Sequence, residues 1–278
     1  MSFSRVEKKV KHPGMVGVVG AVAGSMGAVW LAWNPEEQTM AWVQTALLLA
    51  IFIAFIGYKS WRFRKWVALC GQGAALLDAG DLGAAQRALE DADGYALRPP
   101  ERVLTRFQLG LCALFQGRVD AARAAFLALS RGWRTKEMPD VYVAAPDMLA
   151  ACLALQGDLV EARHWLEEAH RRRRPGVVNL SLGEVLILCR EERYGATVRL
   201  LDDRREFVEK STVLYRKLLR VIRAFAWDAL TTEEGANQGE EPKDLEPFRP
   251  GEFNSLGGQW PRMEAFLRAR GLTDREAA

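Results

Sequence analysis

Residues 150–169 read AACLALQGDLVEARHWLEEA, and the same order of large, small and glycine residues occurs twice upstream, as GLCALFQGRVDAARAAFLAL at 110–129 and GAALLDAGDLGAAQRALEDA at 73–92. The three segments start 37 and then 40 residues apart. In each segment, apolar residues three and four apart predict a helix that ends at a glycine, followed by a second helix. Repetition at this period indicates stacked helix pairs and therefore an all-α fold.

Small residues mark the places where the two helices of each unit cross closely, because a larger side chain there would push the helices apart. The glycine between the helices can adopt the left-handed backbone that ends the first of them. The crossing residues are Gly73, Gly110 and Ala150 in the first helices and Ala85, Ala122 and Ala162 in the second, and the central glycines are Gly80, Gly117 and Gly157.

This order of residues resembles the tetratricopeptide repeat over about residues 66–174. The units depart from that family in being longer than about 34 residues and in starting with Leu69, Arg106 and Pro146, where the family often has an aromatic residue. The resemblance implies an α-solenoid of 3–4 repeats that binds other proteins.

The chain after residue 174 continues the same pattern and then changes in character. Residues 180–204 predict a degenerate fourth unit that has lost its central glycine, and residues 211–230 predict a helix that caps the stack. Residues 231–259 are rich in Glu, Gly and Pro and predict a flexible acidic linker. Residues 260–278 form a short C-terminal segment whose helix is expected from Pro261 to Arg270.

Upstream of the repeats lie two uncharged, mostly apolar runs, residues 14–33 and 40–58. Each is close to the roughly 20 residues that cross a bilayer as a helix. The six residues between them cannot hold a domain, so residues 14–58 predict a transmembrane hairpin between a basic tail, residues 1–13, and a soluble domain, residues 59–230. A signal peptide that is cleaved from the first run is the alternative.

Positive charges decide the orientation of this hairpin. Four Lys or Arg residues precede the first run and four follow the second, whereas the turn carries two Glu and no positive charge. Positive flanks stay on the cytoplasmic side, so both termini are expected to be cytoplasmic in a two-pass protein. Trp66 is expected at the inner membrane interface. The general layout is weakly similar to that of the HemY-type inner-membrane proteins of bacteria, so a bacterial inner membrane is the expected location.

The first apolar run also carries a stripe of small residues, Gly20, Gly24 and Ala28, which recur every four positions. Such a stripe lets helix backbones approach closely in lipid. It is expected either to pack on the second helix of the same hairpin or to bind another membrane helix, including that of a second copy in a homo-oligomer.

Composition and motifs give no indication of an enzyme. The net charge of +3 over 278 residues is too small to favour nucleic acid as a partner. The four cysteines are far apart within apolar helical patterns, which predicts buried reduced thiols and no metal site. No nucleophile motif or phosphate-binding loop is present. We therefore expect no catalytic residues and no cofactor, with an enzyme or regulator that uses an unrecognised site as the remaining alternative.

The resemblance to the tetratricopeptide repeat implies a concave binding face built from the first helix of each unit. The groove residues that it implies are Leu77, Leu104, Phe107, Leu111, Leu114, Phe115, Ala151 and Leu155. This face is apolar, which suits an amphipathic helix or an extended apolar peptide. Either such a ligand fills it, or the protein's own chain does, through the helix around Phe266 or residues 133–143.

A run of four arginines follows the third unit, at Arg171, Arg172, Arg173 and Arg174. It is expected either to contact anions, such as lipid headgroups, an acidic partner or the acidic linker, or to form a solvated helix end. Together these features predict a membrane-anchored scaffold for membrane-associated protein partners. A structural subunit assembled through the glycine-rich transmembrane helix is the alternative.

Overall fold

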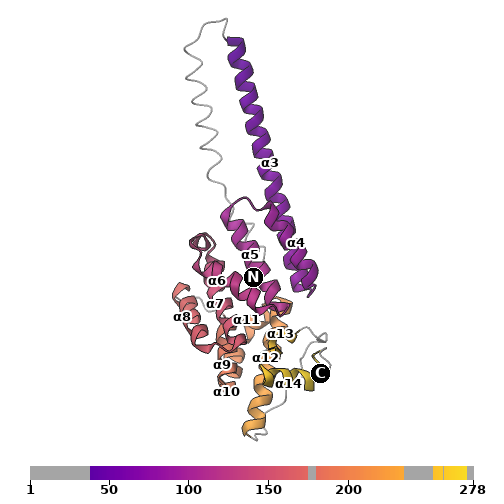
Figure 1. Ribbon diagram of the computed structural model, residues 1–278, viewed down its shortest axis with the longest axis vertical. Helices are drawn as coiled ribbons and strands as arrows, with labels where there is room; N and C mark the ends of the chain where they lie inside the picture. The colour runs from indigo at the N-terminus through magenta and orange to yellow at the C-terminus, as the bar shows by residue number, and fades with distance from the viewer. Residues whose placement is uncertain (1–37, 175–179, 235–252, 259, 274–278) are drawn as a thin grey trace. The chain divides into compact units, whose positions relative to one another are not determined.

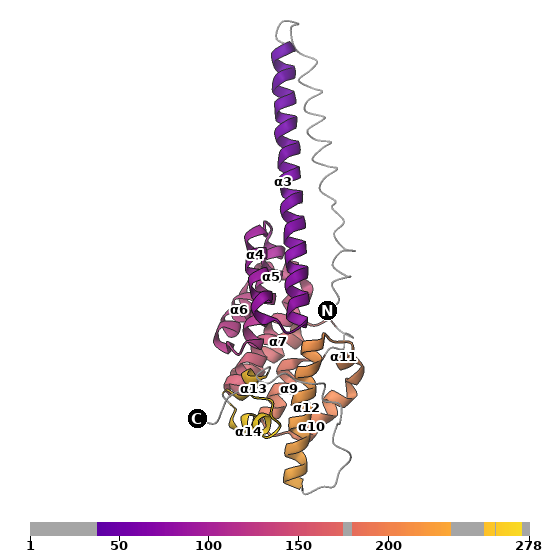
Figure 2. The same ribbon diagram turned by 90° about the vertical axis from the view of Figure 1, so that its right-hand side faces the viewer.

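The computed structural model describes residues 38–174, 180–234, 253–258 and 260–273, and these residues form helices joined by turns (Figures 1 and 2). The chain divides into two compact units, Met1–Arg64 and Lys65–Ala278, which are described separately. The helices are α3 (Gln38–Asp78), α4 (Leu82–Tyr95), α5 (Pro99–Phe115), α6 (Val119–Arg131), the 3-10 helix η1 (Trp133–Glu137), α7 (Pro139–Gln156), α8 (Leu159–Arg172), α9 (Leu182–Arg190), α10 (Tyr194–Asp203), α11 (Arg205–Glu209), α12 (Val213–Glu234), α13 (Asn254–Gly257) and α14 (Pro261–Ala269).

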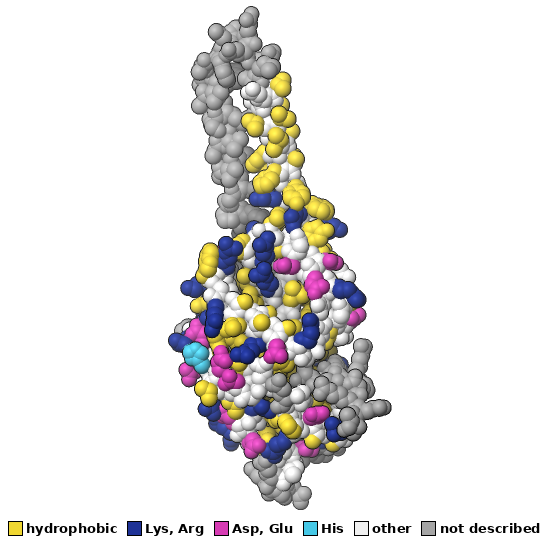
Figure 3. All heavy atoms as spheres, viewed as in Figure 1, with side chains coloured by type: hydrophobic (Ala, Val, Ile, Leu, Met, Phe, Trp, Pro, Cys, Tyr) yellow, Lys and Arg dark blue, Asp and Glu magenta, His cyan; other side chains and the backbone are white. Residues whose placement is uncertain are grey.

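The described part of the first unit is residues 38–64 of α3, and most of its large apolar side chains are exposed, whereas some, including Phe52 and Ile56, are half-buried. Figure 3 shows these side chains in yellow along the visible face of the helix. By length and composition, α3 is a helix that could cross a membrane once. The expected second apolar run, residues 40–58, thus lies in one exposed apolar helix, and the exposed residues include Trp42, Leu47, Leu48, Ile51, Ile53, Phe55, Tyr58 and Trp61. The expected first run, residues 14–33, lies outside the described residues.

Helix α3 does not end where the apolar run ends. The expected boundary between hairpin and soluble domain was Tyr58, but the helix continues to Asp78 over 41 residues, which corresponds to about 60 Å at the usual rise per residue. The residues after Tyr58 are mostly Lys, Arg, Trp, Ala and Leu without proline. No proline interrupts this segment, so the apolar run and the first helix of the first helix pair form one element.

The second unit is a stack of helix pairs. Each helix from α4 to α8 packs on the next one in the chain, and α9 packs on both α7 and α8. Figures 1 and 2 show α5, α6 and α7 side by side in this order. One continuous apolar core runs from α5 to α14. A smaller cluster of Ala85, Leu89 and Cys112 joins α4 to α5.

The predicted glycine turns are confirmed in all three units. Gly80, Gly117 and Gly157 have φ of 79°, 78° and 86°, which is the left-handed region. The residue after each glycine donates its N–H to the carbonyl five residues earlier, as in Asp81 N to Leu76 O at 3.0 Å and Asp158 N to Leu153 O at 3.0 Å. Each glycine also donates its own N–H to the carbonyl three residues earlier, as in Gly80 N to Leu77 O at 3.1 Å. Together these two hydrogen bonds satisfy the last carbonyls of the helix.

The fourth unit makes the same turn without a glycine. Glu192 takes the central position with a φ of 60°, and Arg193 N donates to Leu188 O at 3.0 Å. The unit therefore keeps the backbone geometry of the other three although its sequence pattern has degenerated. Left-handed backbone costs a residue with a Cβ atom about 1 kcal/mol. We therefore expect a side-chain interaction of Glu192 that compensates for this cost.

The predicted close crossings are also present. A Cβ atom on Gly73 would lie 2.6 Å from Leu89 Cγ, and one on Gly110 would lie 2.9 Å from Phe126 Cε1. The alanines at the other crossing positions, Ala85, Ala122 and Ala162, are completely buried. Gly183 continues the series between α9 and α7, since a Cβ there would meet the Asp147 carbonyl at 2.9 Å.

The C-terminal part of the chain packs on the end of the stack. Helix α12 packs on α9 and α10 and corresponds to the expected capping helix. Its Phe225 ring lies 5.1 Å from the Trp260 ring and 5.5 Å from the Phe266 ring, measured between centroids. The helix predicted from Pro261 to Arg270 forms as α14, and it buries the Met263, Phe266 and Leu267 side chains.

The ends of the expected acidic linker belong to this packed region. Residues 231–234 continue α12, and α13 occupies Asn254–Gly257. Phe253 and Leu256 are buried in the main core. The physical reason is that these two apolar side chains can contribute burial that the surrounding Glu, Gly and Pro residues cannot. The central part, residues 235–252, lies outside the described residues.

Candidate functional site

The predicted groove residues come together in one apolar cluster, mainly on α5 and α7, which contact each other. Their exposure divides them into two groups. Leu77, Leu104 and Leu111 are half-buried, whereas the remaining five are buried: Phe107, Leu114, Phe115, Ala151 and Leu155. The half-buried leucines are therefore the members of this set that a partner can reach.

Phe107 packs inside its own helix pair. Its ring meets the Phe126 ring of α6 edge-on, with the centroids 5.6 Å apart. Phe126 is the residue that fills the space left by Gly110. Phe107 thus contributes to the packing of α5 on α6, and any ligand contact on α5 has to come from the neighbouring face.

That neighbouring face contains Leu104, Gln108 and Leu111, which are spaced four and three residues apart and so lie side by side on a helix. Gln108 is 7% exposed, and its Oε1 has no hydrogen-bond partner among the described residues. A buried acceptor without a partner is costly. The apolar periodicity of the sequence did not indicate this buried polar side chain.

The α7 end of the face is covered by the protein's own chain. Asp147 is buried and accepts hydrogen bonds from Ser181 Oγ and, at 3.2 Å, from Gly183 N. Burial raises the pKa of the Asp147 carboxyl, although these hydrogen bonds and the charge of Arg173 oppose the increase. Burial also raises the pKa of Tyr215 in α12, and the Asp147 carboxylate adds to this effect. The start of α9 therefore occupies this end.

The two segments that were expected to fill the groove lie apart from each other, one on α12 and one against α5 and α7. Phe266 packs on Phe225 of α12, at the far end of the stack. Helix η1 lies against both α5 and α7. Its Thr135 is buried, and the Thr135 hydroxyl donates to Leu129 O at 2.8 Å.

The four arginines have different environments. Arg172 bridges three places: Nε contacts Glu168 at 2.7 Å, Nη2 donates to Ser130 O at 2.9 Å, and Nη1 donates to Tyr142 O at 3.2 Å. Arg173 is half-buried and its charge lowers the pKa of Asp147. Arg171 and Arg174 are exposed. Only part of the run is therefore available to an anion.

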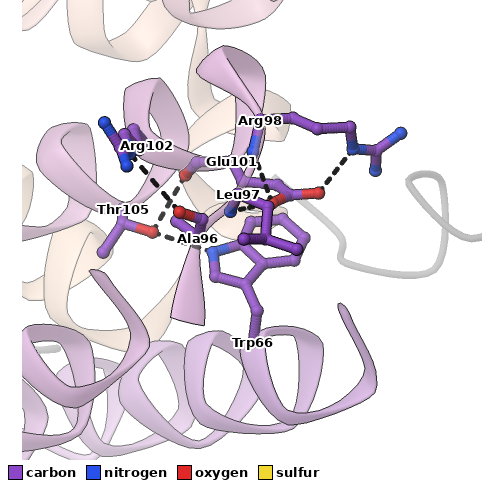
Figure 4. A network of polar contacts seen from close by, with 7 residues as sticks. All are labelled: Trp66, Ala96, Leu97, Arg98, Glu101, Arg102 and Thr105. Carbon is purple, nitrogen blue, oxygen red and sulfur yellow. Dashed lines mark hydrogen bonds and ion pairs between the residues drawn. The ribbon is translucent and has the colours of Figure 1, made fainter. Parts of the chain in front are cut away.

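A buried polar network that the sequence pattern missed ties α3 to α5 (Figure 4). Trp66 Nε1 donates to Thr105 Oγ1 at 3.0 Å, and Thr105 Oγ1 donates to Glu101 O at 2.9 Å. The buried Glu101 carboxylate accepts from Leu97 N at 2.7 Å and Arg98 N at 3.0 Å, which caps α5. Trp66 is 6% exposed, so its expected place at the membrane interface was wrong. Its indole N–H has a better partner inside the protein.

The four cysteines are buried and unbridged, as expected. Burial raises the pKa of the Cys112 thiol to about 11 and those of Cys152 and Cys189 to about 12. Within the described ranges, no group of three or more His, Cys, Asp and Glu residues could hold a metal ion. The stripe of Gly20, Gly24 and Ala28 lies outside these ranges.

The arrangement thus offers a half-exposed apolar strip on a stack of helix pairs, and an exposed apolar segment in α3, the helix that also starts the stack. Comparison with protein-family models, with curated proteins and with solved structures finds no match for this chain.

Proposed function

We propose that the protein is a membrane-anchored scaffold. A hairpin of residues 14–33 and 40–58 holds a tetratricopeptide-like solenoid of 3–4 repeats at the cytoplasmic face of a bacterial inner membrane, and the solenoid binds membrane-associated proteins without catalysis. The observation that carries this proposal is the exposed apolar surface of α3 in the same helix that starts the stack of helix pairs.

The anchor is supported by the energetics of that surface. Each large apolar side chain that stays in water forgoes about 1.5–3 kcal/mol of burial energy. At least eight such side chains are exposed between Trp42 and Trp61. Lipid is the environment that covers all sides of a helix at once, whereas a protein partner covers one face.

The tetratricopeptide-like character is supported by the four matched turns and by the small residues at the crossings. In the repeats that this pattern resembles, the first helices line the binding surface. Here the corresponding accessible side chains are Leu77, Leu104 and Leu111. An amphipathic helix or extended peptide with apolar anchors fits this strip.

Crosslinking in membranes tests the proposal. A photoreactive residue at Leu111 should capture a specific membrane-associated protein, and Leu104→Glu should abolish the capture. Val160 is the matched control, because it is an exposed apolar residue of α8, at 82% exposure, outside the strip. Capture that is unchanged by Leu104→Glu but lost with Val160→Glu would place the binding surface elsewhere.

A structural subunit is the second candidate, and the same exposed surface of α3 favours it. In that case the apolar helix and the stripe of Gly20, Gly24 and Ala28 would make the main contacts within the membrane. Gly24→Leu should then release the partner while Leu104→Glu should not. A scaffold predicts the opposite pair of results.

A further inference from the structure

Trp133 is an exposed tryptophan on a well-fixed turn. It begins η1, its side chain is 69% exposed, and the Arg134 guanidinium lies 5.1 Å from its ring centroid. The turn itself is held by Thr135, whose N–H donates to Gly132 O at 3.2 Å and whose hydroxyl donates to Leu129 O. The backbone therefore presents the indole to the outside instead of burying it.

Basic residues from two parts of the chain surround this turn. Arg131, Arg134 and Lys136 are exposed next to Trp133. The end of α8 is brought to the same place by Arg172, which bonds to the carbonyls of Ser130 and Tyr142 on either side of η1. Residues 131–137 and 168–174 together contain seven Lys or Arg and two Glu.

The acidic residues offset only part of this positive charge, and Glu137 is the exposed one of the two. Glu168 forms ion pairs with Arg171 and Arg172, each at 2.7 Å. Its charge therefore offsets arginines of its own helix, α8. We define the basic–aromatic surface as the exposed Lys, Arg and Trp residues of the two segments, namely Arg131, Trp133, Arg134, Lys136, Arg171 and Arg174; Glu137 and His170 are exposed beside them. It combines an excess of positive charge with one amphipathic ring.

We propose that the basic–aromatic surface is a second membrane-contact site, which binds the anionic headgroups of the bilayer that holds α3. This inference rests on the proposed membrane anchor. Each Lys or Arg near an anionic membrane surface contributes about 1 kcal/mol, and a tryptophan ring is favoured at the headgroup level. Anchoring raises the local concentration of lipid around the helical unit, so weak individual contacts suffice.

The test uses the full chain reconstituted with vesicles of phosphatidylcholine alone or of phosphatidylcholine mixed with phosphatidylglycerol. An environment-sensitive fluorophore is attached to Glu137→Cys, which leaves the six surface residues intact. The native cysteines are buried, so they need not be removed. Val160→Cys carries the control label. Flotation of each sample with its vesicles reports the anchor independently of the fluorophore.

With phosphatidylglycerol, the emission at residue 137 should shift to the blue and rise by about twofold or more, as expected for a label that reaches the headgroup region. The double change Arg134→Glu with Lys136→Glu should remove this response, and the label at residue 160 should not respond. Flotation should be the same with both lipid mixtures.

Other outcomes separate the two proposals. A protein that floats with both vesicles but gives no response at residue 137 overturns the membrane-contact site alone, as does a response that survives the charge reversal. Flotation only with phosphatidylglycerol overturns the anchor and keeps the contact site. Flotation with neither overturns both. A response to polyglutamate or RNA, but not to phosphatidylglycerol, would assign the surface to an acidic macromolecule.

Discussion

At the scale of single residues, the helical unit depends on positions where no atom can be added or where the backbone is unusual. The side chain of Phe126 is completely buried against Gly110, so its ring cannot move away. Glu192 has a left-handed backbone. The buried thiols cannot ionise at neutral pH, because water is excluded from them.

Gly110→Ala tests the close crossing of α5 and α6. The added Cβ would lie 2.9 Å from Phe126 Cε1, so the free energy of unfolding should fall by about 1–3 kcal/mol. Gly94→Ala is the control, because a Cβ on that helical glycine meets nothing within 4 Å and should raise stability by up to about 1 kcal/mol. Thermal unfolding followed by circular dichroism in detergent measures both. Equal effects of the two changes would contradict the close packing.

Glu192→Gly separates backbone strain from an ion pair. Relief of the left-handed backbone should add about 1 kcal/mol to the free energy of unfolding. The change also removes the contact between Glu192 and Arg262 Nη1 at 2.6 Å. Because both side chains are partly exposed, that contact is worth less than about 1 kcal/mol. Glu192→Gln keeps the strain, and it should be neutral or slightly destabilising by denaturant titration. A destabilised glycine variant would show that the ion pair outweighs the strain.

The buried thiols predict a loss of stability at alkaline pH. In the unfolded chain they ionise near pH 8.5, whereas in the folded chain the pKa is about 11 for Cys112 and about 12 for Cys152 and Cys189. Between these values the unfolded state has lost protons that the folded state retains, so the free energy of unfolding falls as pH rises above about 9.

Comparison of the wild type with Cys152→Ala over this pH range checks the sign. The variant is less stable at neutral pH because it leaves a small cavity, but its stability should fall less steeply with increasing pH. Parallel curves for the two proteins would show that Cys152 does not contribute to the alkaline loss.

At the scale of helices, the sequence predicted the elements well where a local rule decides them. The glycine turns at Gly80, Gly117 and Gly157 and the limits of α14 follow from backbone conformations that few residues adopt. The left-handed Glu192 was not predictable, because no local preference selects glutamate there. The hydrogen-bond partner of Trp66 and the burial of Gln108 depend on residues far away in the chain, so periodicity could indicate their helices but not their surroundings.

Arg172 connects α6, α7 and α8, so its loss should lower the free energy of unfolding. Its side chain is 10% exposed, against 67% for Arg171. Arg172→Ala leaves the carbonyls of Ser130 and Tyr142 without this donor, so it should cost about 2–3 kcal/mol of unfolding free energy. Arg171→Ala should cost less than about 0.5 kcal/mol. Urea unfolding of the two variants measures the difference, and similar midpoints would mean that the bridge is weak.

At the scale of the whole chain, the C-terminal segment completes the core although it follows a long acidic stretch. Phe266 is buried against Phe225. Phe266→Ala should therefore cost about 3–5 kcal/mol, and proteolysis near residues 253–273 should become faster. The exposed Arg268→Ala is the control, and it should leave both the thermal midpoint and the rate of cleavage unchanged.

The small cluster around Leu89 has a mechanical consequence. Helix α4 is joined to its neighbour by few buried side chains, Ala85 and Leu89 with Cys112, whereas the later helices share one large core. Separation of α4 from α5 need not disturb the other helices, because local unfolding follows the number of buried apolar contacts. Amide protons of α4 should therefore exchange with deuterium before those of α7. A mechanical load applied through α3 should detach α4 before the later helices.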